Sequence, residues 1–123
     1  MTFFIRILVL LLTTAALHSA AQSVDFTKAN FADNKEGLRE AMKELKDGDT
    51  EYAADPPRYA QALPHYLAAQ QFNPKNACLN VKIDDCYLHS ASKTAALLYL
   101  QKAAKLDVTA LSARTFCWLA PCT

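Results

Sequence analysis

Residues 59–74 read YAQALPHYLAAQQFNP, and this stretch decides the fold. Its apolar side chains recur every three to four residues, which is the spacing of one face of an α-helix, and Asn73-Pro74 ends the pattern. A shift of 34 residues aligns this stretch with a second one that has the same spacing. The core pairs aligned by this shift are Ala62 with Ala96, Leu63 with Leu97, Tyr66 with Leu100, Ala69 with Ala103, and Phe72 with Leu106. Matches at a single offset indicate an internal repeat built from helices.

Start and stop signals around this repeat predict four helices. They are expected over about residues 34–53, from Pro57 to the Asn73-Pro74 pair, over 77–88, and from Ser90 or Ser92 to Leu106. Asp33 and Glu36 have the spacing of a capping box for the first helix, and Asn76 can cap the third. Pro64 lies inside the second helix and should bend it. Because no stretch has the alternation of a strand, the expected fold class is all-α.

The 34-residue period and the residue types at its core resemble the tetratricopeptide repeat (TPR). Ala62 and Tyr66 fit its A-x3-F element, and Pro74 closes the repeat. In the second copy, residues 83–87 match the L-G-x2-Y element except that Asp84 replaces the small residue. The resemblance implies two TPR-like helical hairpins over residues 34–107, a fragment of an α-solenoid. The alternative is a pair of helical hairpins whose spacing is coincidental.

A narrower resemblance covers residues 26–107. The segments FTKANFADNKE, YAQALPHYLAAQQFNPKNA, KIDDCYLHS and ALLYLQKAAKLD are similar to the N-terminal repeat region of OmpA-family envelope proteins of gliding-type Gram-negative bacteria. In that family the repeats precede a β-propeller-like region and a peptidoglycan-binding OmpA-like domain. The resemblance does not reach those domains. It therefore implies association with outer-membrane or peptidoglycan-bound proteins, but not peptidoglycan binding by this chain.

The N-terminal residues 1–21 predict a cleaved signal peptide. A positive start is followed by an apolar run of about eleven residues and by the small residues Ser19-Ala20-Ala21. The run is shorter than the roughly 20 residues of a membrane-spanning helix, so a retained anchor is the alternative reading. The expected location is the periplasm or the outer membrane. In an oxidising compartment the cysteines can pair in three ways, and they are Cys78, Cys86, Cys117 and Cys122.

Two further segments flank the expected helices. Residues 22–33 form a polar lead-in, expected to pack loosely on the first helix. Residues 108–123 form an atypical tail, because Val108 stands where the repeat should have a proline. One hypothesis is that this tail is read out of frame, which would make the chain a truncated relative of a longer protein. A disulfide between Cys117 and Cys122 is one local pairing within the tail.

Composition and motifs argue against catalysis. Lys and Arg number 13 against 12 for Asp and Glu, which leaves no electrostatic footprint for nucleic acid. Two isolated glycines cannot build a phosphate-binding loop. Asp85, Cys86 and His89 supply at most half of a metal site, since a full site needs about four ligands. We therefore expect no enzyme activity, no metal and no cofactor.

The remaining candidate is a binding groove for a partner protein. In a TPR hairpin the first helix of each pair lines a concave surface, where a peptide or a helix can bind. The expected groove residues are Lys43, Lys46, Thr50, Ala53, Cys78, Val81, Asp85, Leu88 and His89. Val81 and Asp85 stand where related co-chaperones have a carboxylate clamp, which argues against that mode of capture. The alternatives are a structural segment that forms a homo-oligomer or completes a longer solenoid, and a small redox or metal protein that uses Cys78 and Cys86.

Overall fold

The computed structural model describes residues 22–90, 92–109 and 122. The expected signal peptide, Cys117 and most of the tail lie outside these residues. The described part contains helices and no strand, so the all-α prediction is confirmed. Its helices are α2 (Lys35–Tyr52), α3 (Tyr59–Phe72), α4 (Ala77–His89) and α5 (Lys93–Leu106).

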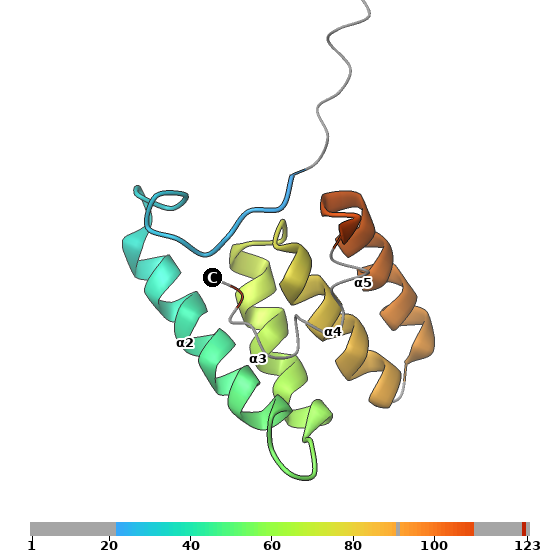
Figure 1. Ribbon diagram of the computed structural model, residues 1–123. Helices are drawn as coiled ribbons and strands as arrows, with labels where there is room; N and C mark the ends of the chain where they lie inside the picture. The colour runs from blue at the N-terminus through green and yellow to red at the C-terminus, as the bar shows by residue number, and fades with distance from the viewer. Residues whose placement is uncertain (1–21, 91, 110–121, 123) are drawn as a thin grey trace, which may run out of the picture.

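The helices are arranged as two hairpins in chain order. Each helix packs against the next one along the sequence, and successive helices run in opposite directions (Figure 1). Buried side chains of α2 recur at helical spacing, from Leu38 through Leu45 to Tyr52, so one stripe of this helix faces the core. Most residues on the other side of α2 are exposed to solvent.

Side-chain caps begin three of the helices. Asn76 accepts a hydrogen bond from the Leu79 N–H at 2.9 Å, which confirms the expected cap of α4. Ser92, and not Ser90, caps α5. The capping residue of α2 was predicted wrongly: Asn34 accepts from the Gly37 N–H at 3.0 Å, one position after Asp33. This shift leaves Glu36 inside the first turn, where its carboxylate pairs with Arg39.

Small residues allow α2 and α3 to approach closely. Ala62 and Ala69 of α3 are fully buried, with the ring of Tyr66 between them in sequence. Gly48 of α2 faces that ring, and a Cβ atom placed on Gly48 would lie 2.7 Å from Tyr66 Cε1. Pro64 lies inside α3, as the sequence predicts, and is exposed there. The close approach of these helices therefore depends on side-chain size at Gly48.

The lead-in was expected to pack loosely on the first helix, and this prediction is wrong. Phe26 is only 2% exposed and belongs to the main core, where its ring lies 6.5 Å from that of Phe72. The Val24 N–H donates to the Lys75 carbonyl at 2.8 Å, and the Val24 carbonyl accepts from the side chains of Asn73 and Asn76. These buried amides need hydrogen-bond partners, and the lead-in supplies one. The segment is therefore bound across the turn between α3 and α4 (Figure 1).

Candidate functional site

One face of α2 carries two adjoining cavities. The first has a volume of about 490 Å³, and its lining residues are Lys28, Lys35, Leu38, Arg39 and Met42. The second has a volume of about 520 Å³, and its lining residues are Met42, Leu45, Lys46, Asp49, Thr50, Ala53 and Cys122. We call these residues together the α2 groove. Met42 lines both cavities and is 41% exposed, so it stands at the centre of the groove.

The α2 groove combines an apolar floor with a cationic rim. Leu38 and Leu45 are buried side chains of the floor, next to the partly exposed Met42. The rim carries the exposed cations Lys28, Lys35, Arg39 and Lys46. Arg39 is paired with Glu36, whose charge is exposed beside it. The arrangement suits a ligand that presents carboxylates around an apolar side chain.

Asp49 is the one carboxylate among the lining residues of the α2 groove, and its negative charge is paired with groups of the protein itself. Its Oδ1 accepts hydrogen bonds from the Tyr66 hydroxyl and from the Lys82 ammonium, both at 2.6 Å. Burial alone would lower the pKa of Lys82, but the neighbouring Cys122 and Asp49 outweigh it and the pKa is raised. Lys82 is therefore a buried cation, and this network joins α2, α3 and α4.

A second buried network joins α2 and α4 near the C-terminal end of α2. The Tyr52 hydroxyl donates to Asp85 Oδ2 at 2.6 Å, and burial together with this bond raises the pKa of Tyr52. Asp85 Oδ1 also lies 3.6 Å from His89 Nε2. The His89 ring stacks on Tyr59 with a centroid distance of 4.3 Å. Asp85 and His89 are thus held by neighbours in α2 and α3.

The structure brings together part of the predicted groove. Lys46, Thr50 and Ala53 line one cavity, and Cys78 reaches it through contact with Cys122. The remaining residues of the predicted set lie elsewhere. Val81 is buried with Ala77 and Ala103, so it faces α5. Leu88 is partly exposed near the end of α4, while Asp85 and His89 make the contacts described above.

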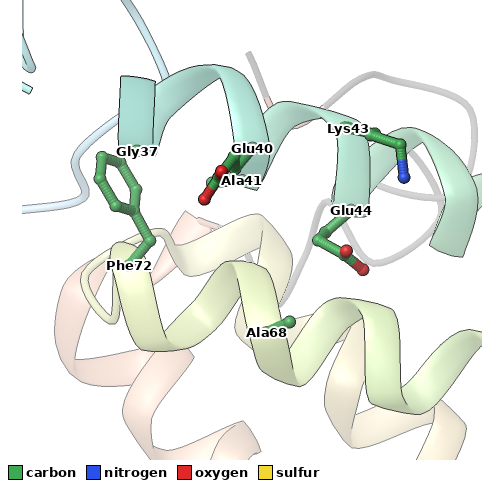
Figure 2. Close-up of a pocket in the computed structure, with 7 residues that line it drawn as sticks. All are labelled: Gly37, Glu40, Ala41, Lys43, Glu44, Ala68 and Phe72. Atoms are coloured by element: carbon green, nitrogen blue, oxygen red, sulfur yellow. The ribbon is translucent and has the colours of Figure 1, made fainter. Parts of the chain in front are cut away.

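Lys43 lines a different cavity, between α2 and α3 on another side of α2. This cavity has a volume of about 440 Å³, and its lining residues are Gly37, Glu40, Ala41, Lys43, Glu44, Ala68 and Phe72. Figure 2 shows Phe72 beneath Gly37 at one end, with Glu40 and Glu44 reaching from α2 towards α3. Glu44 Oε2 lies 2.7 Å from His65 Nδ1. This cavity carries two carboxylates, whereas the rim of the α2 groove carries cations.

Eight of the eleven residues of the α2 groove are absent from the set predicted from the sequence. Lys35, Arg39 and Met42 lie at helical spacing from Lys46 and Thr50, so extending the face by two turns would have found them. Lys28 belongs to the lead-in, and no periodicity places it beside α2. Cys122 also lines the groove, and no sequence pattern around it predicts this position.

Within the described ranges there is no group of three or more His, Cys, Asp or Glu side chains that could bind a metal ion. Cys86 is fully buried, and burial together with Asp85 raises the pKa of its thiol to about 12. No helix in this part of the chain is both long enough and apolar enough to cross a membrane.

Fold and groove together define the class: an all-α protein of two helical hairpins with a basic, apolar-floored groove along α2. Comparisons with protein-family models, with curated proteins and with solved structures find no match to this chain.

Proposed function

We propose that this protein is a non-enzymatic interaction module of the TPR type, which binds an acidic peptide segment of a partner protein in the α2 groove. One observation carries the proposal: an exposed Met42 lies on an apolar floor that four cationic side chains surround. The 34-residue repeat of the sequence supports the TPR assignment. The groove on α2 supports a binding role for it.

The dimensions of the groove suggest the length of its ligand. α2 has 18 residues and so extends about 27 Å. An extended peptide of about eight residues covers that distance. An apolar side chain at its middle would bury Met42, while carboxylates on either side would meet Lys35 and Lys46. We therefore expect a ligand with Asp or Glu flanking one or two large apolar residues.

Fluorescence anisotropy with two synthetic peptides of about ten residues tests this proposal. One peptide carries Glu on both sides of a central Leu-Phe pair, and the other carries Lys at the Glu positions. The acidic peptide should bind, and binding should weaken as salt is added because the contacts are at an exposed rim. The basic peptide should not bind.

Matched variants assign the binding to the α2 groove. Lys46→Glu and Arg39→Glu should each weaken binding by about tenfold, because a rim charge becomes repulsive. Lys43→Glu is the control, since Lys43 lies on the same helix but lines the cavity between α2 and α3. Equal losses for Lys43→Glu and Lys46→Glu, or tighter binding of the basic peptide, would exclude the α2 groove as the site.

A second candidate function is self-association through α5. Leu97 and Leu98 of this helix are 55% and 52% exposed, so two adjacent large apolar side chains face solvent. A second copy that covers them would form a homo-oligomer or continue the row of helices. Light scattering over a range of protein concentrations tests this candidate, with Leu97→Gln and Leu98→Gln as the variants expected to remain monomeric.

We also propose that the protein is exported and acts at the cell envelope. The support is the charge and apolar pattern of residues 1–21 in the sequence. N-terminal sequencing of the protein purified from its host tests this, and a mature chain that starts at Gln22 is the expected result. Retention of Met1 together with a cytoplasmic location would refute the proposal.

A further inference from the structure

Two cysteines that are far apart in sequence meet beside the α2 groove. The Sγ atoms of Cys78 and Cys122 lie 3.2 Å apart, although 44 residues separate them. Cys78 is half-buried on the first turn of α4, and Cys122 is 6% exposed and lines the larger cavity of the groove. A disulfide has an S–S length of about 2.05 Å, so an approach of about 1 Å would join the two sulfur atoms.

The surroundings of this pair favour thiolate chemistry at Cys122. The hydrogen bond with Cys78 and the positive charge of Lys82 lower the pKa of the Cys122 thiol, against the opposing effects of burial and Asp49. Lys82 follows Cys78 by one helical turn, so both side chains lie on the same face of α4. The Asp49 bond holds the Lys82 ammonium in place. Cys86 differs, because burial and Asp85 raise its pKa.

We propose that Cys78 and Cys122 form a redox-active dithiol, which a low-molecular-weight disulfide oxidises to an intramolecular disulfide bond. This pairing differs from a local bond between Cys117 and Cys122 and from a site that uses Cys86. The cavity of about 520 Å³ that Cys122 lines gives a small disulfide access to its sulfur.

The exchange proceeds in two balanced steps. The Cys122 thiolate attacks one sulfur of the small disulfide, the S–S bond breaks, and one small thiolate leaves. Cys78 then loses its proton to solvent and attacks Cys122 Sγ in the mixed disulfide, which releases the second small thiolate. The two protein thiols lose two electrons and two protons, and the small disulfide is reduced to two thiols.

Oxidation would also change the α2 groove. The new bond would fix Cys122 covalently against α4, inside the cavity that Lys46 and Thr50 line. This consequence rests on the function proposed above: a ligand that needs this cavity should bind the reduced protein better than the oxidised one. The formation of the disulfide does not depend on that function and can be measured separately.

Peptide mapping of the oxidised protein tests the pairing. The reduced full chain is incubated with glutathione disulfide, remaining thiols are blocked with iodoacetamide, and the protein is digested with trypsin. Cleavage after Lys75, Lys82, Lys93 and Arg114 places Cys78 in peptide 76–82, Cys86 in peptide 83–93, and both tail cysteines in peptide 115–123. The expected product joins peptide 76–82 to peptide 115–123, and Cys86 is recovered with the blocking group.

Cysteine variants complete the assignment. The cross-link should persist in Cys117→Ser and disappear in both Cys78→Ser and Cys122→Ser. A loop closed within peptide 115–123, a link to peptide 83–93, or loss of the cross-link in Cys117→Ser would overturn the proposal. So would the absence of any cross-link after complete equilibration with glutathione disulfide.

A separate measurement tests whether Lys82 favours the thiolate of Cys122. In Lys82→Gln the rate of disulfide formation at pH 7 should fall on the order of tenfold, and the pH midpoint of the rate should rise by about one unit, since a cation no longer favours the thiolate. Lys82→Arg should retain most of the wild-type rate, and circular dichroism reports whether each variant is folded. An unchanged pH midpoint in a folded Lys82→Gln protein would refute this role.

The peptide of the binding experiment tests the consequence for the groove. The acidic probe should bind the reduced protein at least tenfold more tightly than the mapped Cys78–Cys122 disulfide form. Equal binding by the two forms would refute the groove consequence and leave the mapped disulfide standing. Absence of binding by both forms would count against the proposed function.

Discussion

The Lys82 ammonium of α4 donates to Asp49 Oδ1 of α2 at 2.6 Å, although Lys82 itself is only 3% exposed. A buried cation is stable only when its partner is present, because its desolvation is costly. The hydroxyl of Tyr66 donates to the same oxygen, so one carboxylate connects three helices. The stability of the fold should therefore depend strongly on Asp49.

Asp49→Ala should lower the free energy of unfolding by about 1–3 kcal/mol. Loss of a buried pair often costs about 3–5 kcal/mol, and the smaller range allows for the partial exposure of Asp49. Urea unfolding measures the change, and Asp47→Ala is the control, because Asp47 pairs with Lys43 at the surface and should cost under about 0.5 kcal/mol. The double variant Asp49→Leu/Lys82→Met should be more stable than Asp49→Ala. A double variant less stable than the single one would contradict this account.

Phe26→Ala should destabilise the protein by about 3 kcal/mol, since it removes a ring that is almost completely buried. Phe31→Ala is the matched control in the same aromatic cluster, and it should cost less because Phe31 is only partly buried. Urea unfolding of both variants distinguishes a bound lead-in from a loose one. If Phe26→Ala costs no more than Phe31→Ala, the lead-in does not contribute to the core in the way described.

Gly48→Ala should destabilise the protein by about 1–3 kcal/mol, even though alanine is about 1 kcal/mol better than glycine inside a helix. The added methyl group would lie 2.7 Å from the Tyr66 ring and 3.3 Å from His65 Cβ, so α2 and α3 would have to move apart. Thr50→Ala on the exposed side of α2 is the control and should change stability little. Thermal melting checks both, and a higher melting temperature for Gly48→Ala would show that the helices are not in such close contact.

Stability should fall as the pH rises above about 9, with the protein kept reduced. Burial raises the pKa of Cys86 to about 12, and burial together with hydrogen bonds to carboxylates raises the pKa of Tyr52 and Tyr66. In the unfolded chain these groups ionise near their ordinary values, so the unfolded state releases protons that the folded state keeps. Each group then lowers stability by up to about 1.4 kcal/mol per pH unit. Urea titrations between pH 8 and 11 measure the slope.

Two cysteine variants should change the pH dependence of stability in different pH ranges. Cys86→Ala removes a group whose folded pKa is raised, so the fall in stability above pH 9 should become shallower. The pKa of Cys122 is lowered in the folded state. Its contribution to stability is therefore complete above the pKa of the unfolded chain and is lost as the pH falls through the folded pKa. Cys122→Ser should therefore lose more stability relative to the wild type at pH 9 than at pH 7. Parallel curves for the wild type and both variants would contradict the assigned pKa directions.

Local signals in the sequence predicted most of the helical architecture. Asn76 and Ser92 begin helices because a short polar side chain can bond to a free N–H three residues later, and such a signal is contained in four residues. The same signal was ambiguous at α2, where Asp33 and Asn34 are both good capping residues. Adjacent candidates of this kind differ only in backbone geometry, which the sequence does not display.

Long-range side-chain contacts explain what could not be predicted. Asp49 and Lys82 are 33 residues apart, and each resembles an ordinary surface charge in the sequence. Val81 was expected at the groove by its position in the repeat, but α5 covers it, since nearly every face of α4 is buried. Which face of a helix remains open depends on what packs around it, so the candidate site was only partly predictable.

The contacts of the lead-in constrain the order in which segments of this protein can fold during synthesis. Asn73, Asn76 and Ala77 bind Val24 and Ser23 across sequence separations of 49, 52 and 54 residues. Residues 22–34 are synthesised early, because translation starts at the N-terminus. They cannot form these hydrogen bonds until the start of α4 has been synthesised. The Phe26 ring packs near that of Phe72, so part of its buried environment is also absent until α3 has been synthesised. The first residues of the described chain are thus among the last to reach their final positions.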